Sequence, residues 1–317
     1  MKKTIIIILL LGSSFNLSAN NQKLSDEFTS QFGLFYRHQS ASKLFDNSGN
    51  NVTDYPLPKR ATDTSNYRNL YDNTSNQIGF SIRYSFLKNF VVYSDFGIKF
   101  NQLEEKLSGA YHSPDGLYQG SYTTLNSKIF YRTTSELLIG LRYRLYEADI
   151  FSYFSADVKF PNNFSAGPAA AADTNGFPVD TSDNKFLAGK TPFEFSPNLT
   201  IGYKFEKSRI SLNSTYLIRS DNWANAIKIR ANIGFETVPD TYLQFFLQYY
   251  RTISDSVDKA KMNFFRYPDF PETLNAGTNF SLFVNKAFVM KFNFDIDLLG
   301  KNCWSNSNIG VGACVFF

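Results

Sequence analysis

The chain has 317 residues, a formal net charge of +4 and an aromatic content of 17%. A charge this close to neutral gives no reason to expect a nucleic-acid partner. After residue 19, no stretch approaches the roughly 18 consecutive apolar residues of a membrane-spanning helix. Many aromatic residues at a mean hydropathy of −0.27 instead suit a barrel in which every second residue faces lipid, with a soluble β-sandwich as the alternative.

The N-terminus has the features of a secretion signal. Lys2 and Lys3 precede an apolar run from Ile5 to Leu11, and small and polar residues follow. This order predicts a signal peptide over residues 1–19, cleaved after Ala19. Residues 20–317 would then form one domain, because no later segment has the pattern of a second one.

The mature chain alternates between strand-like and turn-rich segments. The clearest strand pattern is in residues 77–86, where apolar residues such as Ile78 and Phe80 alternate with Gly79 and Arg83. A period of two predicts a strand with one apolar and one polar face. In the first strand this pattern places Phe28 on the apolar face. The same pattern predicts twelve strands, at about 28–37, 77–86, 90–101, 129–145, 150–160, 193–205, 210–219, 226–237, 241–251, 275–285, 287–298 and 307–317.

The connections between these strands are alternately short and long. Short turns are expected at 87–89, 146–149, 206–208, 238–240 and around 286, and long loops at 39–76, 104–128, 161–192, 220–225, 252–274 and 299–306. An even number of strands puts both termini and all short turns on one side. The sequence therefore predicts an all-β, twelve-stranded antiparallel transmembrane β-barrel with short periplasmic turns and long external loops. The loop at 39–76 could also fold inward.

The last strand, Ser307 to Phe317, has apolar residues at alternate positions and ends on an aromatic residue. It resembles the C-terminal signal of bacterial outer-membrane barrels. That resemblance implies the barrel-assembly machinery and outer-membrane lipid as partners, and the cell outer membrane of a Gram-negative-type bacterium as the location. Cys303 and Cys314 should lie near opposite ends of this strand, too far apart for a disulfide.

Assigning Leu, Ile and Phe to the lipid face fixes which residues face the lumen. The inward positions hold twelve basic and seven acidic side chains, an excess of five positive charges. These charges either form structural pairs, such as Glu136 with Lys159 across a four-residue turn, or line a pathway that favours anions and polar solutes. Inward aromatic rings could likewise form a track for apolar solutes or simply fill the barrel. The candidate lumen-lining residues are Arg83, Asp95, Arg142, Arg144, Tyr153, Asp157, Lys159, Lys204, Arg219, Lys228, Arg230 and Lys291.

Catalytic, metal and cofactor motifs are not found in the sequence. The two histidines are His38 and His112, and no local motif supports a pairing of His38 with Ser152 or Ser214. No metal-ligand spacing or nucleotide-binding loop is present. We therefore expect no enzymatic activity, no catalytic residues, no bound metal and no cofactor.

One hairpin resembles a known family. The segment Leu137 to Leu145, followed by Phe154 to Pro161, is similar to a hairpin of the MetA-pathway phenol-degradation transporters of the outer membrane. That family is similar in organisation to the long-chain fatty-acid channels. The resemblance implies uptake of small, partly hydrophobic molecules.

Two functions are open at this point. The first is an outer-membrane channel or transporter for small, hydrophobic or anionic solutes of unknown identity. The second is a surface barrel, an adhesin or receptor, whose long external loops bind a host or environmental partner. A channel should conduct in a planar bilayer, with a selectivity that changes when Arg142 and Arg144 become Ser. Trimming of the loops at 39–76 and 161–192 should abolish partner binding in the second case.

Overall fold

The computed structural model describes residues 28–45, 48–52, 54–56, 67–112, 119–130, 134–160, 163–164, 189–190, 192–220, 224–253, 272–285, 287–301 and 303–317. The expected signal peptide, residues 1–19, lies outside these ranges. Within them, no helix is long and apolar enough to cross a membrane.

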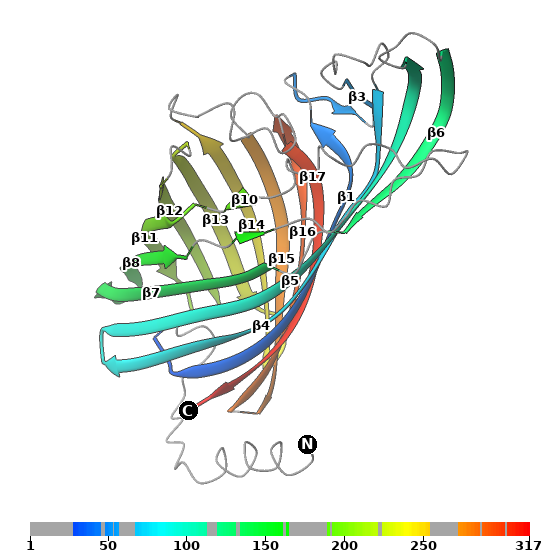
Figure 1. Cartoon of the computed structure of the whole chain (residues 1–317). Helices are drawn as coiled ribbons and strands as arrows, with labels where there is room; N and C mark the ends of the chain where they lie inside the picture. The colour runs from blue at the N-terminus through cyan, green and yellow to red at the C-terminus, as the bar shows by residue number, and fades with distance from the viewer. Residues whose placement is uncertain are drawn as a thin grey trace, which may run out of the picture.

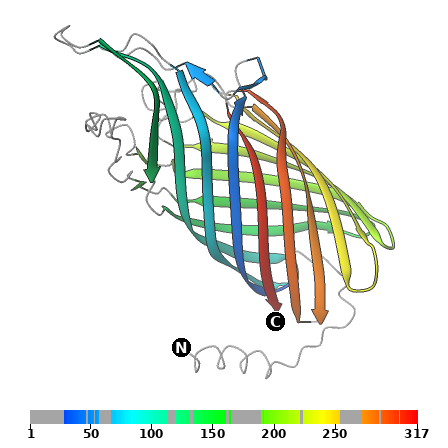
Figure 2. The same ribbon diagram turned by 90° about the vertical axis from the view of Figure 1, so that its right-hand side faces the viewer.

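Twelve antiparallel strands form a closed barrel (Figure 1). Each strand pairs with the next, and the last pairs with the first, so that the two lie side by side in Figure 2. The predicted twelve-stranded barrel is confirmed, and the alternative of a β-sandwich is wrong. The barrel strands are β1 (Gln31–Phe45), β4 (Tyr67–Leu87), β5 (Phe90–His112), β7 (Thr134–Glu147), β8 (Ile150–Lys159), β11 (Glu194–Lys204), β12 (Ser208–Arg219), β13 (Ala226–Glu236), β14 (Thr241–Thr252), β15 (Glu272–Asn285), β16 (Phe288–Lys301) and β17 (Cys303–Phe316).

The two ends of the barrel differ. Short connections join β4 to β5, β7 to β8, β11 to β12, β13 to β14 and β15 to β16, all at one end, which we call the turn end. Gln31 at the start of β1 pairs with Phe316 at the close of β17, so both ends of the sheet also lie there. The opposite end is called the loop end.

The strands at the loop end are longer than the sequence pattern predicts. β4 and β5 run beyond the barrel wall and pair there with β3 (Asp54–Pro56) and β6 (Gln119–Phe130), while β2 (Asn51–Val52) pairs with β1. The expected loops at 39–76, 104–128 and 299–306 are therefore wrong in part, and the strand expected from 129 begins at Thr134. The apolar alternation disappears in these segments although the backbone pairing continues, because strands beyond an apolar belt have no lipid face to cover.

Two short strands account for the described part of the expected loop at 161–192. β9 (Asn163–Phe164) pairs with β10 (Gly189–Lys190) as a separate two-stranded sheet. Residues 165–188 of that loop, and residues 254–271 of the loop expected at 252–274, lie outside the described residues. Ser220, Ala224 and Asn225 belong to no strand, in agreement with the expected loop at 220–225.

The two faces of the barrel wall have opposite chemistry. Leu34, Ile78 and Leu212 are 57%, 58% and 54% exposed, and similar apolar residues alternate with buried ones along every barrel strand. The buried face is the inner one, because it makes contacts between strands that are not neighbours. The Tyr93 hydroxyl of β5, for example, donates a hydrogen bond to the Asp157 carboxylate of β8, with β7 between them.

The hairpin of β7 and β8 has a different register from the predicted one. A four-residue turn would place Arg144 opposite Phe151, but Arg144 pairs with Tyr153 because the turn is shorter and a bulge lies between Arg144 and Tyr146. Lys159 pairs with Leu138 instead of Glu136. The predicted ion pair still forms, with 3.3 Å between Lys159 Nζ and Glu136 Oε1, because long side chains reach diagonal neighbours on the same face.

Candidate functional site: a polar ring inside the barrel

Polar side chains from all twelve barrel strands are linked into a ring on the inner face. The links are hydrogen bonds, ion pairs, a cation–π contact and direct cross-strand pairs between neighbouring strands. Strand tilt and register together bring these positions to a common level, which is mid-strand on the long strands β1, β4 and β5 and at the loop end of the shorter β8, β11 and β12. We call this set the polar ring: Arg37 and Gln39 on β1, Gln77 on β4, Lys99 on β5, Glu136 on β7, Lys159 on β8, Glu194 on β11, Arg219 on β12, Lys228 on β13, Tyr250 on β14, Asn275 on β15, Asp295 and Asp297 on β16, and Asn306 and Asn308 on β17.

The first part of the ring is cationic. Arg37 is the cross-strand partner of Gln77, which pairs in turn with Lys99. Gln77 Nε2 lies 3.4 Å from Glu136 Oε2, and the same carboxylate forms the ion pair with Lys159. The links between these residues thus run unbroken from β1 to β8.

The cationic part continues through β11 to β14. Glu194 is the cross-strand partner of Lys159 and accepts a 2.9 Å hydrogen bond from Arg219 Nε. The Arg219 guanidinium carbon lies 5.9 Å from the centre of the Tyr250 ring, and Tyr250 pairs with Lys228. From β1 to β13 the ring contains five cations and two carboxylates, which leaves three positive charges in excess.

Lys99 and Lys228 differ from Lys159 and Arg219, which form ion pairs. Within the described part of the chain, neither Lys99 nor Lys228 forms an ion pair, although each is close enough to glutamates of the ring to interact electrostatically. Arg219 and Lys159 form ion pairs with carboxylates, so Arg37, Lys99 and Lys228 carry the three excess charges. The ammonium groups of the two lysines can attract an anion without first breaking an ion pair.

The remaining part of the ring is acidic and amide-rich. Asp295 accepts hydrogen bonds from the side-chain amides of Asn275 and Asn308, at 2.9 and 2.6 Å. Asp297 accepts from the amide of Asn275 at 3.1 Å and from both the backbone and side-chain nitrogens of Asn306, at 2.9 and 3.0 Å. In the described structure these neutral donors are the hydrogen-bond partners of both carboxylates, so their negative charges are held in place without being neutralised.

The ring closes at the seam between the first and last strands. Gln39 Nε2 on β1 donates a 2.8 Å hydrogen bond to Asn306 Oδ1 on β17. On the other side, Asn275 pairs with Gln248, the inward neighbour of Tyr250 on β14. In a closed sheet of twelve strands the strand six places from β16 is β8. Asp295 and Asp297 therefore lie across the barrel from Lys159, in the middle of the cationic arc.

The chain has the fold of an outer-membrane β-barrel. An outer-membrane channel of known structure from Pseudomonas putida F1 superposes with a TM-score of 0.56 at 14% identity, covering 94% of this chain and 99% of that one. The likeness extends over the whole barrel, and at this identity it concerns the fold alone.

More distant likenesses include proteins of different function. The toluene transporter of Ralstonia pickettii gives a TM-score of 0.47 at 8% identity, covering 91% of this chain and 90% of that one. The β-domain of a Bordetella autotransporter gives 0.48 at 9% identity, covering 91% and 100%. Both scores are too low to indicate a function. No family model matches the chain, and no curated protein matches it either.

The sequence-predicted lumen candidates fall into three groups. Lys159, Arg219 and Lys228 belong to the polar ring. Arg230 and Lys291 follow on the inner face toward the turn end, where Arg230 donates to Asn232 at 2.9 Å and lies over the Phe246 ring at 3.7 Å, and Lys291 pairs with Gly312. The third group also lies on the turn-end side of the ring, and its members are Arg83, Asp95, Arg142, Arg144, Tyr153, Asp157 and Lys204.

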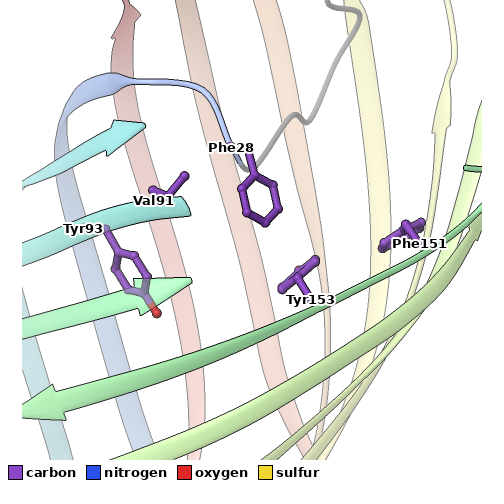
Figure 3. Close-up of a cluster of buried hydrophobic side chains, with 5 residues drawn as sticks. All are labelled: Phe28, Val91, Tyr93, Phe151 and Tyr153. Carbon is purple, nitrogen blue, oxygen red and sulfur yellow. The ribbon is translucent and has the colours of Figure 1, made fainter. Parts of the chain in front are cut away.

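Part of the third group surrounds a buried aromatic cluster (Figure 3). Tyr93, Phe151 and Tyr153 are at most 8% exposed, and the Arg142 guanidinium carbon lies 5.3 and 4.9 Å from the centres of the Tyr93 and Tyr153 rings. Lys204 forms a 3.0 Å ion pair with Glu147 at the turn. Packing of this kind narrows the interior at the turn end.

Phe28 completes this cluster and corrects the sequence prediction. It was expected on the outer face of the first strand, but β1 begins only at Gln31, and Phe28 is 8% exposed inside the barrel. Its ring packs edge-on against Tyr153, with centres 5.9 Å apart, and the Arg144 guanidinium carbon lies 4.0 Å from it. Ser30 is bonded to both neighbouring strands, so the chain turns inward just before it reaches the wall.

The amide members of the ring were missed because amides carry no charge signal. Gln77, Asn275 and Asn308 were not among the predicted lumen candidates, and nothing in a single strand shows that they contact carboxylates on the next one. A repeated signal does exist, since each of the strands β14 to β17 has at least one amide at an inward position: Gln244, Gln248, Asn275, Asn279, Asn293 and Asn308. Among the described residues, no group of His, Cys, Asp and Glu is arranged to hold a metal ion.

Proposed function

We propose that this chain is a channel of the cell outer membrane of a Gram-negative-type bacterium, through which small polar or anionic solutes pass down their gradients. The polar ring is the observation that carries the proposal. A barrel that served only as an anchor would have no need of an inner ring whose arc from β1 to β13 has three excess positive charges, whereas ring charges set selectivity in pores. The chain would be exported by its signal peptide and folded by the barrel-assembly machinery.

The outer surface supports insertion into lipid. Exposed Leu, Ile and Phe side chains cover the wall, and a water-soluble protein rarely presents a continuous apolar surface of this extent. Near the turn end the outward rings of Phe86, Phe90 and Tyr143 lie against one another, with centres 5.7 and 4.5 Å apart. Aromatic residues are favoured at this depth, where a bilayer meets water.

The solute remains to be identified, and partly hydrophobic molecules stay within the proposal. Two of the inner aromatic rings, Tyr93 and Phe151, lie against glycines and so do not project into the interior as parts of an apolar track. Tyr93 covers Gly140 and Phe151 covers Gly202 on neighbouring strands, so these rings lie along the wall. Polar and charged groups of the ring therefore dominate the middle of the pathway.

Single-channel recording tests the proposal. Purified, folded protein added to a planar lipid bilayer should produce discrete conductance steps. Replacement of Arg142 and Arg144 by Ser should increase the step size, because both side chains occupy the narrowed turn end. Folded protein that inserts but stays silent, in the wild type and in this variant, would refute the channel and favour the surface-binding function.

A further inference from the structure

The polar ring has an electrical asymmetry that a simple anion pore does not need. Its cationic arc runs from β1 to β13, while the carboxylates of Asp295 and Asp297 lie on β16 with neutral hydrogen-bond donors. Because β16 and β8 are six strands apart in a ring of twelve, the two carboxylates face Lys159 across the interior. The two signs of charge are thus separated across the pathway.

This separation creates a field perpendicular to the direction of transport. Charges on opposite walls of a narrow, low-dielectric cavity reinforce one another, whereas mixed charges on one wall cancel. A small anion is attracted by the cationic arc but repelled by Asp295 and Asp297. A solute with an anionic and a cationic end can satisfy both walls at once.

The amides around the carboxylates support this separation of positive and negative charge on opposite walls. Asn275 and Asn308 hold Asp295 by two hydrogen bonds, and Asn306 holds Asp297 by two, so both carboxyl groups are fixed in place without a neighbouring cation. If these acids served only to hold the fold together, the basic residues available on the inner face would be the natural partners. Instead the sequence keeps them apart from the cations.

We propose that the polar ring selects small zwitterionic solutes, with the solute carboxylate oriented toward Lys99, Lys159 and Lys228 and its ammonium group toward Asp295 and Asp297. This inference names the solute class of the proposed channel and therefore rests on it. The ring orients such a solute across the pore, and attraction of its two charges to opposite walls offsets the cost of removing them from water, a gain that an uncharged molecule of the same size does not have.

Liposome swelling with two isomers tests this selectivity. β-Alanine is a zwitterion at neutral pH, and lactamide is its uncharged isomer, so size is held constant. Proteoliposomes with wild-type protein should swell faster in β-alanine than in lactamide. The Asp295→Asn, Asp297→Asn variant should lower the ratio of the two rates by about twofold or more, because one wall of the field is removed.

The matched control removes the same two charges elsewhere. Glu147→Gln with Glu236→Gln neutralises carboxylates at the ends of β7 and β13, at the turn end, and should leave the ratio unchanged. Equal ratios in wild type and in the Asp295, Asp297 variant would overturn the zwitterion selectivity while the channel stands. Absence of swelling in both isomers, with folded wild-type protein, would refute the channel itself and the inference with it.

Discussion

Glycines on the inner face show how single residues shape the barrel wall. An added Cβ at Gly79 would lie 2.2 Å from the backbone oxygen of Phe96 and 2.4 Å from the Phe35 ring. Gly140 and Gly202 are covered in the same way by Tyr93 and Phe151. Each large ring therefore lies flat over a glycine of the neighbouring strand, and the wall stays thin where the interior is crowded.

Gly79→Ala should destabilise the barrel by about 1–3 kcal/mol, since the new methyl group meets a backbone atom that cannot move away. The change in the free energy of unfolding is measured by guanidinium titration in lipid vesicles, followed by tryptophan fluorescence. Gly312→Ala serves as the control, because its nearest neighbour would be 3.0 Å away and its cost should be smaller. Equal destabilisation of the two variants would show that the close approach at Gly79 is not what requires glycine there.

The elements most important for closure are the first and last strands. β1 and β17 pair without interruption from Gln31 with Phe316 to Ser40 with Ser307. The inner face of β17 has small side chains at Gly310 and Gly312, beside Asn293 of β16 and the Leu34 carbonyl of β1. The inner face of β17 carries no charge of its own, in line with the pattern of the last eleven residues, and the cation at this seam is Arg37 of β1, opposite Gly310.

Replacement of both Gly310 and Gly312 by Leu should prevent closure or narrow the barrel, because each side chain would meet atoms within 3.0 Å. The shift in electrophoretic mobility between heated and unheated samples reports the folded barrel. Ala313→Leu, which adds the same bulk to the outer face of β17, should fold normally. Normal assembly of the double variant would mean that the two glycines do not face inward.

The strands could be predicted from sequence because lipid imposes a period of two on the outer face. The pattern failed where that constraint stops: at the strand extensions beyond the wall, and at Phe28, whose ring is apolar but packs inside against Tyr153. The register of β7 and β8 also could not be predicted, because the bulge at Arg144 leaves no mark in the alternation. Glu136 and Lys159 were found as partners nevertheless, since both lie on one face.

The polar ring was beyond the reach of the sequence pattern for a different reason. Lys159, Arg219 and Lys228 were singled out by charge and parity, but their common level depends on the registers of several strand pairs at once. An error of two residues in one pair keeps every side chain on its face and still moves it to another level. Asp297 and Asn306 show the same limit, since their contact crosses a connection that was expected to be a loop.

At the scale of the whole molecule, a closed apolar wall surrounds an inner ring with a net positive charge. The outer apolar residues suit a lipid environment. The buried cluster with Phe28 narrows the turn end, and the polar ring lies on the loop-end side of that cluster. Its cations and its two amide-held carboxylates face each other. In the proposed channel, solutes would pass this ring, and its charges should then determine the selectivity.

The reversal potential in a salt gradient tests this most directly. With potassium chloride at unequal concentrations across a planar bilayer, the wild-type channel should show a potential of the sign that chloride selectivity requires. Lys99→Gln with Lys228→Gln should move the potential toward zero or to the cation side, because these two ring lysines have no ion pair in the described structure. Lys204→Gln with Lys207→Gln, at the turn end, should change it much less. A wild-type potential of the cation-selective sign, or equal shifts in both variants, would contradict a selectivity set by the polar ring.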